Sequence, residues 1–211
     1  MKIVAMSDTH MVHPRLHVPR CDLLVHCGDF SRRGSLAELE TFARWYAEQP
    51  ARARILVAGN HDFICDENRA IVREVTARHG ITYLEDEAAE VLGLRLYGSP
   101  ITPAFGSWAF QRRRGSDIAA VWARIPDGVE LLVTHGPPHG LGDRIFLGRH
   151  VGCEALRVRV EQLAPRLHLF GHIHEAHGDH TPPGSPTRYF NVAVRSLLPL
   201  FPDGDVTQIE L

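Results

Sequence analysis

The sequence predicts an α/β protein in which two mixed β-sheets pack face to face. Short apolar runs rich in β-branched residues recur along the chain, each too short for a helix and without a 3.6-residue period. Segments with helical periodicity lie between several of these runs, an alternation typical of α/β architectures. Because the chain has 211 residues, of which 44% are hydrophobic, we expect one globular domain over residues 1–211.

Five runs are expected to form buried strands, and shorter strands are expected after them. The buried strands are predicted at Ile3–Met6, Leu23–Cys27, Ile55–Ala58, Leu131–Thr134 and Leu167–Phe170, and further strands at about Glu90–Tyr97, Tyr189–Val194 and Val206–Leu211. One helix, Ser35–Gln49, opens with a capping box from Ser35 to Glu38. The other helices are predicted at about Glu67–Arg78, where Gly80 provides the stop, and at Asp117–Ala123 and Glu154–Leu163.

Composition limits the classes of partner. The formal net charge of −2 favours neither stable nucleic-acid binding nor an anionic membrane surface. No apolar run approaches the ~20 residues that a membrane-spanning helix needs, and the chain opens directly on an apolar strand without a leader pattern. The four cysteines form no regular framework, so we expect small buried thiols and a reducing, cytoplasmic location. The oligomeric state is left open.

Each buried strand is followed by polar residues that bind metals in other proteins. These residues are Asp8 and His10, Asp29, Asn60 and His61, His135, and His172 and His174. Ligands of open α/β sheets bind beyond the carboxyl ends of the strands, so the five turns should converge on one rim. Glycines at positions 28, 59 and 171 are expected to let the backbone turn sharply before the ligands.

The residue types predict a site for two metal ions. Carboxylates, imidazoles and one amide oxygen form a mixed nitrogen and oxygen set without thiolate, which suits manganese, iron, zinc or similar ions. Seven candidate ligands exceed the four that one tetrahedral zinc would use. Two ions that share a bridging carboxylate account for the surplus. Each fragment alone is weak, because a Gly-Asp pair more often ends a strand or makes a turn.

In combination, the fragments resemble the complete signature of calcineurin-like metallophosphoesterases. They occur in the same order between residues 8 and 174 and read D-x-H, G-D, G-N-H-D, H and G-H-x-H. The segments SDTH, AGNHD, YGSP, THGPP and FGHIHE are most similar to the branch of metallophosphoesterase domain-containing proteins. The resemblance implies a four-layer sandwich of two mixed β-sheets flanked by helices.

The resemblance also implies a role for each matched residue. Asp8, His10 and His174 would hold one ion and Asn60, His135 and His172 the other, with Asp29 bridging both. His61 would be the acid or the transition-state stabiliser beside the phosphate, with its ring oriented by Asp62. Manganese is the first choice of metal, with iron, zinc, cobalt, nickel and magnesium as alternatives. The chain lacks the second Asp that protein phosphatases carry after Gly28-Asp29, which argues against a phosphoprotein substrate.

The predicted activity is hydrolysis of a small phosphodiester by attack of metal-bound hydroxide. A cyclic nucleotide is one candidate substrate, on the branch resemblance alone. A phosphomonoester is the alternative substrate, and a metal-binding scaffold without catalysis is the alternative from another class. The intact ligand set together with His61 favours the enzyme.

A loop rich in aromatic and basic residues follows the predicted strand at Glu90–Tyr97. Phe105–Gly115 is interpreted either as a core-packed loop with a solvated basic end or as a lid that stacks a nucleobase through Trp108 and attracts phosphate through Arg113. Arg144 and Arg149 are further candidates for substrate binding. The histidines expected to face solvent or cap elements are His13, His17, His79, His150, His168, His177 and His180, whereas His26 and His139 could support ligands from behind.

Overall fold

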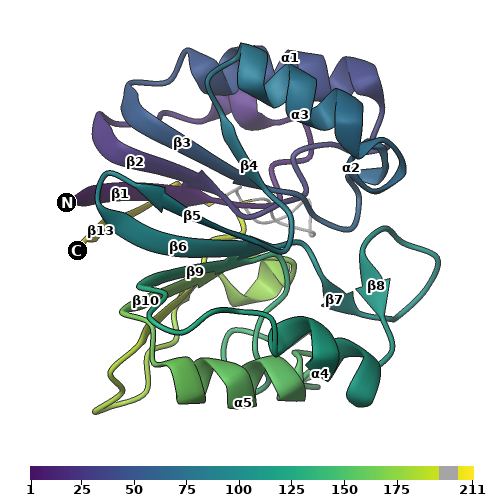
Figure 1. Cartoon of the computed structure of the whole chain (residues 1–211), viewed down its shortest axis with the longest axis vertical. Coiled ribbons are helices and arrows are strands. Elements are labelled where there is room, and N and C mark those ends of the chain that lie inside the picture. Colours follow the sequence, from purple (N-terminus) through teal and green to yellow (C-terminus); the bar gives the residue numbers. More distant parts are fainter. Residues whose placement is uncertain (195–203) are drawn as a thin grey trace.

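A computed structural model describes residues 1–194 and 204–211, and these form four layers (Figure 1). Helices α1 (Leu36–Ala47) and α3 (Arg69–Arg78) cover the outer face of one sheet. Helices α4 (Ser116–Trp122) and α5 (Glu154–Leu163) cover the outer face of the other. The two sheets face each other in the middle of the molecule, so the predicted sandwich is confirmed. Within these residues, no helix combines the length and the apolar character needed to cross a bilayer.

The first sheet is parallel except at one edge. Its order is β13-β1-β2-β3-β4, with bounds Thr207–Glu210, Lys2–Met6, Cys21–His26, Ala51–Val57 and Thr82–Leu84. Only β13 pairs antiparallel, placing Ile209 opposite Ile3. The carboxyl ends of β1, β2 and β3 therefore lie side by side at one edge of the sheet.

The second sheet has a parallel centre with an antiparallel strand at each edge. Its order is β11-β12-β10-β9-β6-β5, with bounds Gly178–Asp179, Arg188–Asn191, Leu167–Phe170, Leu131–Thr134, Leu94–Ser99 and Glu87–Val91. A parallel bridge between Ser7 and Ala193 joins the two sheets just beyond β1. Strands β9 and β10 therefore end close to the end of β1.

Strand alternation divides the core into an inner and an outer part. Ile3 and Ala5 lie between the sheets with Leu131 and Val133, whereas Met6 packs on the outer side in the cluster that contains the helices. Both faces of both sheets are thus covered, which explains the nearly continuous apolar runs. At ~25 cal/mol per Å² of buried apolar area, this double core is the main source of stability.

The predicted helices are confirmed with shifts of one or two residues at their ends. They are α1 (Leu36–Ala47), α3 (Arg69–Arg78), α4 (Ser116–Trp122) and α5 (Glu154–Leu163). Ser35 and Glu38 form the expected capping box, and Gly80 ends the turn after α3 with a φ of 64°. A short helix that was not predicted, α2 (Phe63–Glu67), precedes α3.

The predicted strand at about Glu90–Tyr97 is instead two antiparallel strands, β5 and β6. They are joined at Leu92-Gly93, where φ is 53° and 78°. Positive φ at both positions is the tight hairpin geometry that matches the twist of the strands. The small strands β4, β7 (Thr102–Pro103), β8 (Gln111–Arg112) and β11 were also not predicted, because each is too short to show a period.

Candidate metal centre

The structure brings all seven predicted ligands to one place between the ends of the two sheets. Asp8 and His10 follow β1, Asp29 follows β2, and Asn60 follows β3 in the first sheet. The second sheet supplies His135 after β9, and His172 and His174 after β10, with His174 opening the 3-10 turn His174–Ala176. The predicted common rim is therefore built by both sheets, a division that the sequence did not indicate.

The side chains divide into two groups that meet at Asp29. On one side, the Nε2 atom of His174 lies 3.4 Å from Asp8 Oδ1 and 3.4 Å from His10 Nε2. On the other side, the Nε2 atom of His135 lies 2.9 Å from Asn60 Oδ1. Asp29 Oδ2 lies between the groups, 3.8 Å from His10 Nε2 and 3.6 Å from His135 Nε2.

The donor atoms are close enough together to surround cations. Each of three groups has its ligand atoms within 4.8 Å of one another: Asp8, His10 and His174; His10, Asp29 and His61; and Asp29, His135 and His172. Asp29 belongs to two of them, as a bridging carboxylate must. His61 also belongs to one, so geometry alone does not separate it from the ligands.

Backbone groups fix which carboxylate oxygen faces the centre. The amide of His172 donates to Asp8 Oδ2 at 2.8 Å, and the amide of His61 donates to Asp29 Oδ1 at 2.8 Å. The second oxygen of each carboxylate is left pointing at the imidazoles. Asp8 Oδ1 is buried and accepts no well-formed hydrogen bond from the described residues, an arrangement that a cation would satisfy.

Carbonyls from a single loop fix three of the imidazoles. Nδ1 of His135 lies 2.9 Å from the Cys27 carbonyl, Nδ1 of His10 lies 3.0 Å from the carbonyl of Ser31, and Nδ1 of His61 lies 3.2 Å from that of Arg32. Because a carbonyl can only accept, each Nδ1 carries a proton, and the neutral rings of His10 and His135 offer their Nε2 lone pairs to the centre. Metal-ligating histidines are oriented in this way.

The electrostatics of this ligand set also call for cations. Burial lowers the pKa of His10 to about 4 and that of His172 to about 3, so both rings are neutral at pH 7. Burial, then Asp8 and Asp62, raise the pKa of Asp29 well above its usual value. Burial opposes ionisation of Asp8, but the imidazoles of His174, His135 and His10 outweigh it and lower its pKa. Buried carboxylates beside neutral imidazoles fit divalent ions.

The turns that carry the ligands hold an uncommon backbone conformation. Asp8, His10, Asp29 and His172 all have positive φ, between 40° and 69°, as does Met11 at 66°. Such conformations cost of order 1 kcal/mol or more for a residue with a Cβ and cluster at functional sites. Here they turn side chains from parallel strands back toward a common point.

The three glycines before the ligands serve different purposes. Gly28 has a φ of 105°, as expected of a sharp turn. Gly59 and Gly171 are required instead by close approach, because an added Cβ would lie 2.2 Å from Asp29 Oδ1 or 2.2 Å from Ser7 Oγ. The expectation of a sharp turn is therefore met only at Gly28, and the other two make room for ligand carboxylates and their neighbours.

Asp62 does not orient the His61 ring, contrary to the sequence-based expectation. Its Oδ2 accepts from the amides of Asp29 at 2.9 Å and Gly59 at 2.8 Å. Its Oδ1 accepts from the amide of Ser31 at 3.0 Å and from the Ser31 hydroxyl at 2.7 Å. The carboxylate is fully buried and ties the turn after β2 to the turn after β3.

Two aromatic residues from the 105–114 loop lie against the metal centre. The Trp108 ring is 4.4 Å from that of His61, and the Phe105 ring is 5.2 Å from that of His172. Both side chains remain partly open to solvent, at 38% for Trp108 and 55% for Phe105. The two rings also stack on each other at 6.4 Å, so together they cover His61 and His172. Sequence reasoning selected Trp108 but did not select Phe105.

The basic candidates have different surroundings. Arg149 lines a hollow of about 420 Å³ that also touches Phe105 and His172, so it lies near the centre. Arg114, which was not selected, lines the same hollow and donates to the carbonyls of Val151 and Gly152. Arg113 is exposed, and Arg144 donates to the nearby Gly148 carbonyl. Neither of these two lines the hollow.

Two histidines that were expected at the surface are buried. His13 packs against Phe42 and Trp45 in the outer core, and His168 donates or accepts at 2.9 Å with the Thr134 hydroxyl. Burial lowers the pKa of His13 to about 4 and that of His168 to about 3. His26 supports the turn after β1 through Thr9 Oγ1 at 3.1 Å.

His139 and His150 belong to a different neighbourhood from the ligands. Their rings lie 5.7 Å apart, and His150 Nδ1 is 2.6 Å from Asp143 Oδ1. His139 therefore does not support a ligand as sequence reasoning allowed. All four cysteines are buried and free, in agreement with the expectation of small buried thiols.

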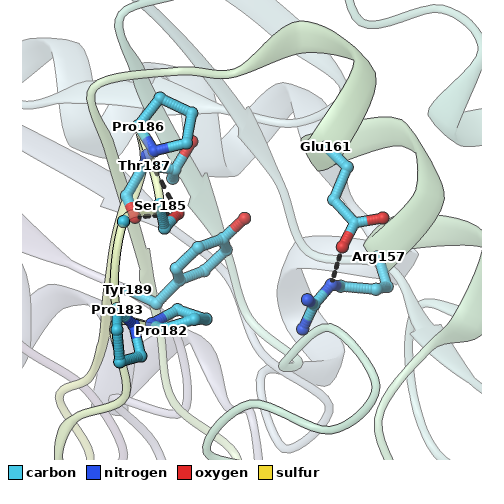
Figure 2. Close-up of a pocket in the computed structure, with 9 residues that line it drawn as sticks. Arg157, Glu161, Pro182, Pro183, Ser185, Pro186, Thr187 and Tyr189 are labelled. Carbon is cyan, nitrogen blue, oxygen red and sulfur yellow. Dashed lines mark hydrogen bonds and ion pairs between the residues drawn. The ribbon is translucent and has the colours of Figure 1, made fainter.

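A second hollow lies away from the ligands and holds none of the predicted site residues. It measures about 360 Å³ and is bordered by Tyr189 and a proline-rich segment, residues 182–187 (Figure 2). On its far side, Arg157 Nε donates to Glu161 Oε1 at 2.6 Å, so its cation is already paired. The hollow beside His172 is therefore the better candidate for substrate.

Comparisons with known proteins agree with this geometry. The human and mouse proteins named metallophosphoesterase domain-containing protein 1 are each 34% identical over 218 residues, covering 92% of this chain. The alignment covers 66% of each relative, so the chain spans just under two thirds of their length.

Solved structures share the fold at low identity. The phosphopantetheinyl hydrolase of Mycobacterium tuberculosis aligns with a TM-score of 0.64 at 17% identity, over 92% of this chain and 89% of that one. An archaeal phosphodiesterase aligns with a TM-score of 0.52 at 18% identity, over 100% of both chains. At these identities the likeness concerns the fold alone.

The family model described as calcineurin-like phosphoesterase matches residues 1–176, which include all seven predicted ligands and His61. Members of this family are phosphoric ester hydrolases that usually bind two divalent metal ions. The chain belongs to the calcineurin-like phosphoesterase family.

Proposed function

We propose that this protein is a binuclear metal-dependent phosphodiesterase acting on a small substrate. The observation that carries the proposal is the place of Asp29, whose Oδ2 lies 3.8 Å from His10 Nε2 and 3.6 Å from His135 Nε2. One carboxylate oxygen thus faces imidazole lone pairs on both sides. A single cation could bind the imidazole on one side only and would leave the other imidazole without a metal.

The residues assigned to the first ion are Asp8, His10 and His174, and those assigned to the second are Asn60, His135 and His172. Two divalent ions bound there supply a hydroxide nucleophile at neutral pH and positive charge beside the phosphoryl oxygens. The protein holds these side chains in advance, because backbone amides fix both carboxylates and backbone carbonyls fix the imidazoles of His10, His135 and the non-ligand His61. Manganese is the metal we would try first.

His61 has the position of a leaving-group acid. Its Nδ1 proton is engaged by the Arg32 carbonyl, so Nε2 is the nitrogen available to a substrate. The ring stands edge-on to His10 at 4.7 Å and is covered by Trp108 at 4.4 Å. In the imidazolium form the ring carries a second proton on Nε2, and transfer of this proton to the departing oxygen would neutralise the alkoxide as the ester bond breaks.

A hollow beside the centre favours a diester over a monoester. The hollow of about 420 Å³ at Phe105 and His172 could hold one organic arm, and the other arm could leave beside His61, where Trp108 is 38% exposed to solvent. A diester has two organic arms to place, whereas a monoester has one. A cyclic nucleotide, whose two ester oxygens belong to a single nucleoside, is a candidate on the branch resemblance alone. The archaeal phosphodiesterase that shares this fold is in line with a diester substrate.

The test uses chelated protein that is reloaded with metal. Protein stripped by chelation is titrated with Mn(II), and metal content and hydrolysis are followed with bis(p-nitrophenyl) phosphate, p-nitrophenyl phosphate and cyclic nucleotides. We expect about two ions per chain and a higher kcat/KM for the diesters. Preference for the monoester would support phosphomonoesterase activity instead. Two bound ions without turnover of any ester would support the alternative of a metal-binding scaffold without catalysis.

The free cysteines bear on the cellular location of the protein. We place it in the cytoplasm, because its four cysteines are unpaired and a reducing compartment keeps them so. The expected partner is the small phosphoester itself.

A further inference from the structure

The hollow beside the metal centre has a mostly apolar wall. Its apolar lining comes from Pro103, Phe105, Pro137, Ile145, Val151 and Ile173. We call this hollow the Phe105 pocket. At about 420 Å³, it falls within the ~300–1,000 Å³ typical of small-molecule sites, which are likewise mainly apolar.

The pocket opens onto the second group of ligands. His172 lines it directly, and the Phe105 ring lies 5.2 Å from the His172 ring. A group held there would therefore sit next to a phosphate bound between the two ions. His61 lies toward the first group of ligands, near His10, and the Trp108 ring that covers it stacks beside the Phe105 ring at 6.4 Å.

The outer lip of the pocket is apolar as well. Phe146 and Leu147, which follow the lining residue Ile145, are each 78% exposed. The amide of Phe146 donates to Glu175 at 3.3 Å, which ties this lip to the opposite wall. Large apolar side chains left in water beside a concave site mark places where ligands or partners bind.

We infer that the Phe105 pocket binds an apolar ester arm that stays on the phosphate, while the arm that leaves departs under Trp108 beside His61. This inference rests on the proposed diesterase function. Water oxygen forms a bond to phosphorus, the bond from phosphorus to the leaving oxygen breaks, and the leaving oxygen takes a proton when it is basic. The product that remains is a monoester whose arm still occupies the Phe105 pocket.

The test keeps the leaving group constant and varies the retained arm. Methyl and n-butyl p-nitrophenyl phosphate both release p-nitrophenolate, so the ratio of their kcat/KM values reports the alkyl arm. Burial of one methylene is worth about fourfold. We expect the butyl ester to be preferred by roughly tenfold to fiftyfold, given up to three added methylenes in the pocket.

Substitutions assign the preference to a place. Ile145→Trp fills the pocket and should bring the butyl-to-methyl ratio close to one while the methyl ester is still hydrolysed. Val158→Trp, on an exposed position of α5, is the matched control and should keep the preference. Trp108→Ala should lower turnover of both esters alike and leave the ratio unchanged. A ratio that collapses in Trp108→Ala but survives in Ile145→Trp would reverse the assignment of the arms and overturn the inference.

A binding measurement separates this inference from the proposed function. Butylphosphonate and methylphosphonate cannot be hydrolysed at their carbon–phosphorus bond, so their Kd values on Mn(II)-loaded protein need no turnover. We expect tighter binding of the butyl compound in the unchanged protein, and equal binding in Ile145→Trp. If Ile145→Trp does not fold, Ile145→Ala should weaken the preference by removing part of the wall. Equal binding of both phosphonates to the unchanged protein would overturn the inference, even if diesters are hydrolysed.

Discussion

The geometry around Asp62 predicts that this residue stabilises the site and is not part of a proton relay to His61. Its carboxylate accepts four hydrogen bonds, from the amides of Asp29, Gly59 and Ser31 and from the Ser31 hydroxyl. In Asp62→Asn, the new amide group must face at least one of these donors. The hydroxyl of Ser31 can turn to the His61 carbonyl at 3.1 Å, but a backbone amide cannot turn away.

The magnitude follows from the number of donors that lose an acceptor. A buried amide left without a partner costs about 1–3 kcal/mol, and more when the lost acceptor is charged. We therefore expect Asp62→Asn to lower the free energy of unfolding by about 2–4 kcal/mol, and Asp62→Ala by more. Against a total of ~5–15 kcal/mol, the loss is easy to measure.

The assay is urea unfolding of the chelated protein, followed by metal content after reloading. Because Asp62 holds the Asp29 amide, Asp62→Asn should also weaken metal binding. Asp127→Asn, at an exposed carboxylate, is the control and should change stability by ~0.5 kcal/mol or less. The reasoning is refuted if Asp62→Asn keeps its stability and both ions yet loses as much kcat as His61→Ala.

The other predictions concern the bridge, the acid, the loop and pH. Asp29→Asn should lower the content of both ions, measured by elemental analysis, and abolish hydrolysis, measured in a diester assay. Full activity of the unchanged protein after exhaustive chelation would contradict the binuclear centre. His61→Ala should keep both ions and lower kcat by roughly 10²–10⁴, less for nitrophenyl than for alkyl leaving groups; loss of an ion would make His61 a ligand. Trp108→Ala should raise KM for nucleotide substrates, whereas Arg113→Ala, in an exposed side chain, should not. Burial lowers the pKa of His168 in the folded protein to about 3, so only the unfolded chain binds a proton there between about pH 6.5 and 3. The free energy of unfolding should therefore fall on acidification through that window by up to about 1.4 kcal/mol per pH unit. In urea titrations, the free energy of unfolding of His168→Leu should depend less steeply on pH, and an equal dependence would place His168 in solvent.

The clustering of the seven candidate ligands could be predicted from the sequence because each comes one to four residues after a buried strand. A strand of four or more apolar residues is recognisable, and the residues after its carboxyl end must lie at the edge of the sheet. Asp8 and His172 illustrate this, each coming two residues after the end of its strand. The sequence did not show that two sheets share the edge, because the bridge from Ser7 to Ala193 joins residues far apart in the chain.

The errors at His168 and Asp62 have physical causes. His168 stands on β10 with Phe170, and both faces of this sheet are covered, so strand alternation was a better guide to its burial than its polarity. Asp62 follows His61 in sequence, but the turn brings its amide back to the Gly59 carbonyl at 3.1 Å and its side chain to the Gly59 amide. Aspartate commonly bonds its own turn in this way. Neighbours in a tight turn therefore need not touch.

The Phe105 pocket was beyond sequence reasoning for a different reason. Its walls come from residues 103–114, 136–152 and 172–175. The longest of these segments, 136–152, contains no helix or strand and therefore no hydrophobic period. Arg149 was selected for its charge alone, whereas the neighbours that give the pocket its apolar character were not selected. Irregular segments are positioned by tertiary contacts, here by Arg114, which donates to the Val151 and Gly152 carbonyls, and by Asn191, which donates to the Gly142 carbonyl.

The loop of residues 27–32 links the fold to the chemistry. Its side chain at Asp29 faces both groups of ligands, and its carbonyls at Cys27, Ser31 and Arg32 hold the rings of His135, His10 and His61. The Asp29 oxygen that we propose to bridge the ions and the three imidazole rings are thus positioned by one backbone segment. Because Asp62 accepts two amides of that segment, at Asp29 and Ser31, loss of its carboxylate should disturb both groups of ligands together. A residue that only oriented His61 would leave metal binding intact, and this difference is what separates the two roles.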